Sequence, residues 1–171
     1  MVYGKGRLLA GFLCAAFLGV VLHFLYGWWP NGVTAMISPL GESIWEHVKI
    51  LYWPYLAAAL VLTWDRPGAL KGWSLVLCLM CGAMLAVGYL VHIVMGYNAL
   101  WVDLLLYFGL MALGFWAPTK MSGPFQGIRW WLPLVGVVAL GILIVVFTLW
   151  PGEGLLFADL SAAPSWAELP C

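Results

Sequence analysis

The sequence predicts an all-α integral membrane protein, with five transmembrane helices forming a single domain over all 171 residues. Hydrophobic residues make up 65% of the chain and charged residues only 8%, whereas a soluble domain has about a quarter charged residues. The mean hydropathy is +1.01. The chain also has 12 tryptophans and 7 tyrosines, whose rings concentrate at the two interfaces of a membrane. These observations indicate that lipid surrounds most of the surface.

Five apolar stretches are long enough to cross a hydrocarbon core of about 30 Å. In chain order, the expected spans are residues 8–29, 42–63, 73–95, 99–117 and 130–150. The turn signals WPNG, DRPG and GYN end the first three spans, and a polar loop ends the fourth. Residues 151–171 are expected to form an extracytoplasmic tail.

Basic residues fall in alternate connections, and this pattern predicts the orientation. Six of the seven precede the first span or lie between spans two and three or four and five: Lys5, Arg7, Arg66, Lys71, Lys120 and Arg129. The connections over 30–41 and 96–98 have none. Because lysine and arginine accumulate in cytoplasmic loops, we predict a cytoplasmic N-terminus and an outside C-terminus, in the cytoplasmic membrane of a bacterium. Zero net charge and scattered basic residues exclude nucleic acid as a partner; the expected partner is the lipid bilayer.

The histidines of the chain are expected at one depth beneath the outer surface. At about 1.5 Å per residue, His23 lies roughly 9 Å from the outer end of its span. His47, His92 and Asp103 fall at similar depths in three other spans. Ionisable groups inside a membrane face the bundle interior or a water-filled cavity, so the four side chains are expected to converge.

The second span adds a polar face to this layer. On a helix, Glu42, Glu46 and Lys49 would lie within about 60° of one another. Ser43 and His47 would form the adjoining stripe. Directing that face at lipid would cost a few kcal/mol per charge, so it is expected to line the same pocket.

Imidazole and carboxylate groups in one layer are typical of a zinc site, with a remaining carboxylate as general base toward a metal-bound water. We therefore expect zinc or another divalent metal, in a hydrolase acting on a lipid-like or other amphiphilic substrate. The expected metal ligands are His23, His47, His92 and Asp103. The expected catalytic groups are Glu46 and Ser43. Further residues expected to line the site are Glu42, Lys49 and Trp45.

Three other interpretations remain open. In a purely structural network, Glu46 would pair with Lys49 at i,i+3 and Asp103 would accept from His92. In a second interpretation, the layer would bind a small ligand or ion, or would relay protons in a transporter, although the polar groups stop in the outer half of the membrane. The Cys78-x-x-Cys81 pair is typical of redox proteins, but its apolar surroundings favour simple packing.

Two stretches, LHFLYGW at 22–28 and SPLGESIWEHVK at 38–49, followed by WP at 53–54, resemble the signature of a family of small, uncharacterised bacterial multi-pass membrane proteins. That signature reads L-H-x-L-Y-x-W, then S-P-x-N-E-S-x-W-E-H-x-K; this chain has Gly41 where the signature has asparagine. The resemblance supplies no activity. It implies that these residues belong to the family's defining motif: His23, Glu42, Ser43, Trp45, Glu46, His47 and Lys49. In its inventory of histidines, aspartate and serine, the chain is also similar to membrane hydrolases related to alkaline ceramidases and progestin/adiponectin receptors, without their H-x-x-x-H pair.

Overall fold

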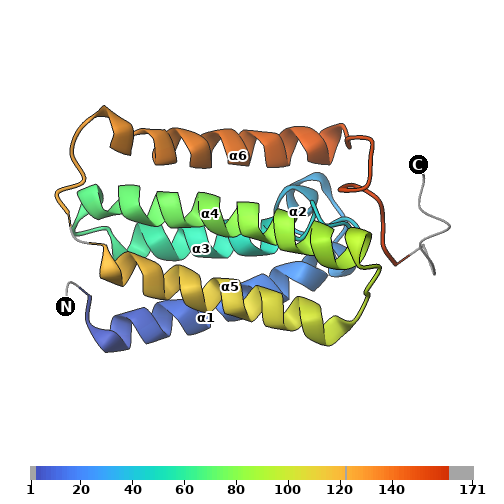
Figure 1. The fold of residues 1–171 in the computed structure, drawn as a ribbon, viewed down its shortest axis with the longest axis horizontal. Coiled ribbons are helices and arrows are strands. Elements are labelled where there is room, and N and C mark those ends of the chain that lie inside the picture. The colour runs from blue at the N-terminus through green and yellow to red at the C-terminus, as the bar shows by residue number, and fades with distance from the viewer. Residues whose placement is uncertain (1–2, 122, 162–171) are drawn as a thin grey trace.

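The computed structural model describes residues 3–121 and 123–161, and these residues form helices and connecting turns without a strand (Figure 1). The elements are α1 Lys5–Trp28, α2 Gly32–Ile37, α3 Val48–Leu62, η1 Pro67–Ala69, α4 Leu70–Gly88, η2 Tyr89–Val94, α5 Leu100–Lys120, η3 Ile128–Trp130 and α6 Leu132–Leu149. The expectation of an all-α fold is confirmed.

The five long helices lie roughly along one direction, and the chain reverses at each connection (Figure 1). The start of α1, the α3–α4 turn and the α5–α6 loop therefore lie at one end of the bundle. We call this the basic end, because it holds Lys5, Arg7, Arg66, Lys71, Lys120 and Arg129. The opposite end contains α2, the α4–α5 hairpin and the segment after α6. We call it the histidine end, because it holds His23, His47 and His92.

Within the described residues, four helical segments are long and apolar enough to cross a membrane: Lys5–Trp28, Pro67–Val94, Leu100–Lys120 and Ile128–Leu149. They correspond to four of the five expected spans. Large apolar side chains cover their outward surfaces; Phe17, for example, is 71% exposed and Leu100 is 75% exposed. An apolar surface this extensive matches lipid better than water.

The expected helix over 42–63 is wrong at its start, because α3 begins only at Val48 and has 15 residues. Its length is about 22 Å, less than a hydrocarbon core of about 30 Å. The backbone of the preceding residues bonds to the segment after α6: Trp45 N–H donates to Leu156 C=O at 3.0 Å, and Leu160 N–H to Glu42 C=O at 3.3 Å. A backbone group paired in this way does not continue a helical ladder.

Up to Ser161, the segment after α6 is therefore packed against the bundle and is not a free tail. Phe157 packs its ring against Trp45 and Phe147, with ring centroids 5.6 Å and 5.0 Å away. Residues 162–171, which include Glu168 and Cys171, lie outside the described residues.

Buried tyrosines connect α3 to the rest of the bundle. Tyr52 O–H donates to Val137 C=O of α6 at 2.9 Å, and Tyr55 O–H donates to Gly114 C=O of α5 at 2.8 Å. In lipid, the hydrophobic effect gives helices little reason to associate, so interhelical hydrogen bonds of this kind help to hold the bundle together. Cys81 is buried in the same core, and Cys78 and Cys81 are both free thiols.

Candidate metal centre at the histidine end

Ser38 attaches the segment 38–47 to α1 next to His23. Its hydroxyl accepts from Tyr26 N–H at 3.0 Å and donates to Leu22 C=O at 2.5 Å. An uninterrupted helix would pair these two backbone groups with each other. Because Ser38 is completely buried, the loop entering α3 is held at a defined position beside the imidazole of His23.

A buried ion pair between Lys49 and Glu46 holds the same loop where it joins α3. The ammonium of Lys49 is 2.6 Å from Oε2 of Glu46 and also donates to the carbonyls of Ala35 and Ser38, at 2.9 and 3.3 Å. Glu46 Oε2 accepts a further bond from Leu40 N–H at 2.7 Å. Lys49 is 0% exposed, and a buried charge requires such partners. The expected i,i+3 pairing of Glu46 with Lys49 is therefore present, and it stabilises the loop.

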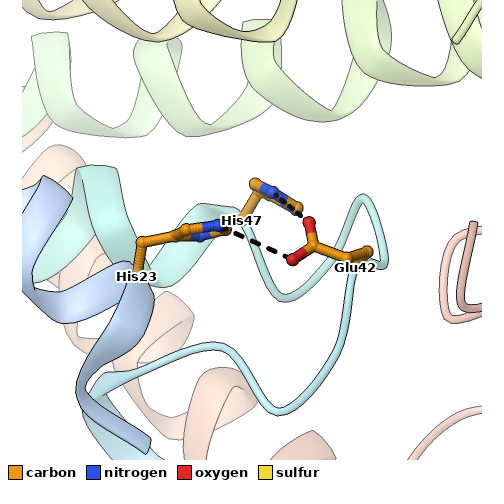
Figure 2. Close-up of side chains that lie close together, drawn as sticks. All are labelled: His23, Glu42 and His47. Carbon is orange, nitrogen blue, oxygen red and sulfur yellow. Dashed lines mark ion pairs between the residues drawn. The ribbon is translucent and has the colours of Figure 1, made fainter. Parts of the chain in front are cut away.

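Three side chains converge where this loop meets α1 (Figure 2). Nε2 of His23 lies 3.6 Å from Oε1 of Glu42, and Nε2 of His47 lies 3.3 Å from Oε2 of the same carboxylate. One ligand atom from each residue lies within 4.8 Å of the other two. Figure 2 shows the carboxylate of Glu42 directed at both imidazoles. The two histidine side chains are 24% and 18% exposed, so the cluster is half-buried.

These separations fit a transition metal. Two atoms that are each about 2.1 Å from a tetrahedrally coordinated zinc ion lie about 3.4 Å apart. The two histidine–carboxylate distances, 3.6 and 3.3 Å, are close to this value, and the widest separation within the trio, up to 4.8 Å, would have to shorten by up to about 1.4 Å. Two imidazoles and one carboxylate are also the protein ligands of several catalytic zinc sites, which keep a fourth position open.

Ser43 orients the imidazole of His47. Nδ1 of His47 lies 2.8 Å from the Ser43 carbonyl, so a protonated Nδ1 donates there and directs Nε2 at Glu42. Metal-binding histidines commonly have their other ring nitrogen held by a carbonyl in this way. The carboxylate of Glu42, 3.3 Å from the same imidazole, adds an oxygen donor of the kind that zinc accepts beside two histidines.

A second histidine–carboxylate pair lies on the facing helices. Nε2 of His92 is 2.8 Å from Oδ1 of Asp103, which is the pairing that the structural-network interpretation predicts, whereas the metal-site interpretation placed both residues among the ligands. His92 belongs to η2, a π-helical turn, and π-helical turns inside helices occur frequently at functional sites. The hairpin that brings Asp103 alongside contains Gly96 with a φ of 63°, a left-handed conformation that glycine adopts without strain.

Glu42 and His47 of the trio and the His92–Asp103 pair border one cavity of about 200 Å³. Its walls include Glu42 and His47 on one side and His92 and Asp103 on the other. Asn98 adds an amide. A cavity of this size with several polar wall groups has room for several water molecules. A metal held by the trio would therefore have water and a second acid–base pair beside it.

The structure brings together only part of the residue set expected from the sequence. His23 and His47 form a cluster with Glu42, which was expected to line the site and instead stands in a ligand position. His92 and Asp103 face the cavity as a separate pair. The side chains of Glu46, Lys49 and Trp45 are engaged elsewhere; Trp45 packs its ring on Phe147. The hydroxyl of Ser43 accepts from Glu46 N–H at 3.2 Å.

Sequence reasoning also missed that the segment after α6 borders the cavity, through Leu160 and Ser161. The stretch FADLS at 157–161 has no motif that would have indicated this. Its position becomes visible only through its backbone bonds to Glu42 and Trp45.

The long apolar helices and the polar cluster at one end are the features of a helical membrane protein. The chain belongs to a family of unknown function (DUF6512), whose family model matches residues 5–163. This agrees with the resemblance to an uncharacterised family, while the detailed signature stays a prediction. No curated protein and no solved structure matches the chain.

Proposed function

We propose that this protein is a multi-pass membrane metalloprotein that binds a divalent transition metal, zinc in the first place, through His23, Glu42 and His47. The observation that carries the proposal is the convergence of three ligand atoms within 4.8 Å. These atoms come from α1 and from the segment that leads into α3, which the buried Ser38 and Lys49 hold in place. A site supported by such outer contacts is preorganised for an ion.

The orientation proposed for the protein places this site on the outer side of the cytoplasmic membrane. Six of the seven basic residues lie at the opposite end of the bundle, where the positive-inside tendency predicts cytoplasm. In this arrangement α3 is a fifth, short pass, and the turns before it complete the distance across the bilayer. A C-terminal fusion is expected to be active as alkaline phosphatase and dark as a fluorescent protein; the reverse result would contradict the orientation.

The chemistry proposed for the site is hydrolysis. Zinc lowers the pKa of a bound water to about 7 and polarises a carbonyl. Asp103, which pairs with His92 and borders the same cavity as Glu42 and His47, is the group best placed to accept the proton, because Glu46 is held by Lys49 and by Leu40 N–H. The cavity of about 200 Å³ is smaller than a typical ligand pocket of about 300–1,000 Å³. Only the scissile group of a lipid-like substrate would enter it, with the apolar remainder in the bilayer.

A non-catalytic polar network is the second candidate, and one observation favours it. Glu42 lies 3.6 Å from Nε2 of His23 and 3.3 Å from Nε2 of His47, and a charged imidazole beside a carboxylate is a stable arrangement in a half-buried site. In that case the trio would stabilise the junction of α1 with the loop and would not bind metal.

Metal analysis of the purified full chain separates the two candidates. We expect about one zinc per chain, with His23→Ala and His47→Ala each lowering the affinity at least about 100-fold, since either removes a direct ligand. His92→Gln is the matched control, because it alters a histidine at the same end that lies outside the trio. A wild-type protein without stoichiometric metal, or an equal loss in the control, would favour the network.

A further inference from the structure

A groove of about 890 Å³ lies between α1 and α3, toward the basic end of the bundle and away from the histidines. It exists because the facing side chains are small: α1 contributes Ala10 and Gly11, and α3 contributes Ala57 and Ala58. Val61, which also lines it, is 75% exposed, so the groove opens at the surface that the bilayer would cover.

The length of the groove matches one leaflet of a membrane. Its lining extends from Tyr3, just before α1, to Leu18, and the part on α1, from Arg7 to Leu18, covers about 16 Å at 1.5 Å per residue. Half of a hydrocarbon core is about 15 Å. An acyl chain entering at the basic end would therefore reach the middle of the bilayer beside Leu18, with its headgroup near Arg7.

The mouth of the groove has charges of both signs. Arg7, Asp65 and Arg66 line it together with Trp64, which is 87% exposed at the level where tryptophan anchors membrane helices. Over the described residues, Arg7 and Asp65 form no ion pair with another protein group. Basic pockets between helices on the cytoplasmic side are typical lipid headgroup sites, and here an acidic group is added.

We propose that this groove binds a phospholipid whose headgroup combines a phosphate with a primary ammonium, phosphatidylethanolamine. One acyl chain lies between α1 and α3, Arg7 and Arg66 bind the phosphate, and Asp65 binds the ammonium. Guanidinium groups bind phosphate with two parallel hydrogen bonds. A phosphatidylglycerol headgroup would bind the arginines equally well through its phosphate, but it has no ammonium to pair with Asp65. The proposal requires only that the bundle is embedded in lipid, and it is independent of the metal site.

Native mass spectrometry of the detergent-purified full chain tests this assignment, with synthetic phosphatidylethanolamine or phosphatidylglycerol added at equal concentration. We expect wild type to retain about 1.5-fold to fivefold more phosphatidylethanolamine, the range of one exposed ion pair. Asp65→Asn is expected to abolish the preference, and Arg7→Gln to lower the binding of both lipids, whereas Arg7→Lys retains part of it. Ala57→Phe fills the groove and is expected to lower the binding of both lipids.

Two matched controls alter the same residue types away from the groove. Arg129→Gln removes a basic residue at the same end, and Ala139→Phe adds a ring to the exposed surface of α6; both are expected to bind like wild type. Equal binding of the two lipids by wild type, unchanged binding by Ala57→Phe, or an equal loss in the controls would overturn the proposal. Zinc content is measured on the same samples, so that failure of the lipid site is distinguished from failure of the metal site.

Discussion

Oε2 of Glu42 lies 3.3 Å from Nε2 of His47, although the two residues are five positions apart in the chain. On an α-helix, positions five apart point about 140° away from each other. The contact exists because the backbone over 42–47 forms turns, which the segment after α6 holds through its bonds to Glu42 and Trp45. The charged stretch before α3 is therefore a shaped loop that presents a carboxylate and an imidazole to the same point.

Glu42→Gln removes the negative charge and one strong metal ligand while keeping the shape of the side chain. We expect the zinc affinity to fall at least about tenfold, since amide oxygen is a poor zinc ligand beside imidazole. Isothermal titration of the metal-free protein measures this. Glu153→Gln serves as the comparison, because it removes an exposed carboxylate at the same end of the bundle, outside the trio and outside the pair with Lys49; an equal loss of affinity in Glu153→Gln would show that the ligand is misassigned.

Asp103→Asn tests the proton acceptor separately from metal binding. Asp103 borders the cavity and pairs with His92 but lies outside the trio. We expect zinc content to remain at the wild-type level, while hydrolysis of any ester or amide substrate that wild type cleaves falls about 10²-fold or more. Loss of zinc together with activity would instead place Asp103 among the metal ligands, as the sequence predicted.

Lys49→Met leaves the carboxylate of Glu46 buried without its ammonium partner. Breaking a buried ion pair from one side costs about 3–5 kcal/mol, and we expect a loss of this size in the free energy of unfolding in detergent. The double variant Lys49→Met/Glu46→Gln is expected to recover most of it, because no uncompensated charge remains. If the single variant unfolds like wild type, the pair does not support the loop.

Gly19→Ala tests the packing of α1 on α3 one turn below His23. An added Cβ would lie 2.7 Å from the backbone carbonyl oxygen of Ile50, which cannot move aside easily. We expect a loss of about 1–3 kcal/mol in the free energy of unfolding and weaker zinc binding, because His23 would shift with its helix. Gly82→Ala in α4 is the control; its Cβ meets nothing within 4 Å, and the variant is expected to be neutral or more stable.

Hydropathy alone predicted the all-helical fold and the positions of four long apolar helices, because each needs about 20 consecutive apolar residues whatever its neighbours are. It also predicted that His23, His47, His92 and Asp103 gather at one end. It failed over 42–47, where apolar and polar residues alternate at helical spacing, but the backbone pairs with a segment more than 100 residues away. Long-range backbone pairing of this kind has no local pattern.

The division of the polar residues into separate groups was not predictable for the same reason. Placed on one helical face, Glu42, Glu46 and Lys49 would have formed a single wedge. In the turn, Glu46 and Lys49 bind the carbonyls and amides of the loop, and Glu42 alone faces the histidines. Which carboxylate joins a cluster is decided by the loop geometry and not by spacing.

X-ray absorption at the zinc edge, on the zinc-loaded wild-type protein, tests the central claim most directly. We expect nitrogen and oxygen ligands at about 2.0–2.1 Å, with two imidazoles per ion, falling to one imidazole in His23→Ala. A sulfur ligand at about 2.3 Å, supplied by any of the four cysteines, or an unchanged imidazole count in His23→Ala would contradict a site formed by His23, Glu42 and His47.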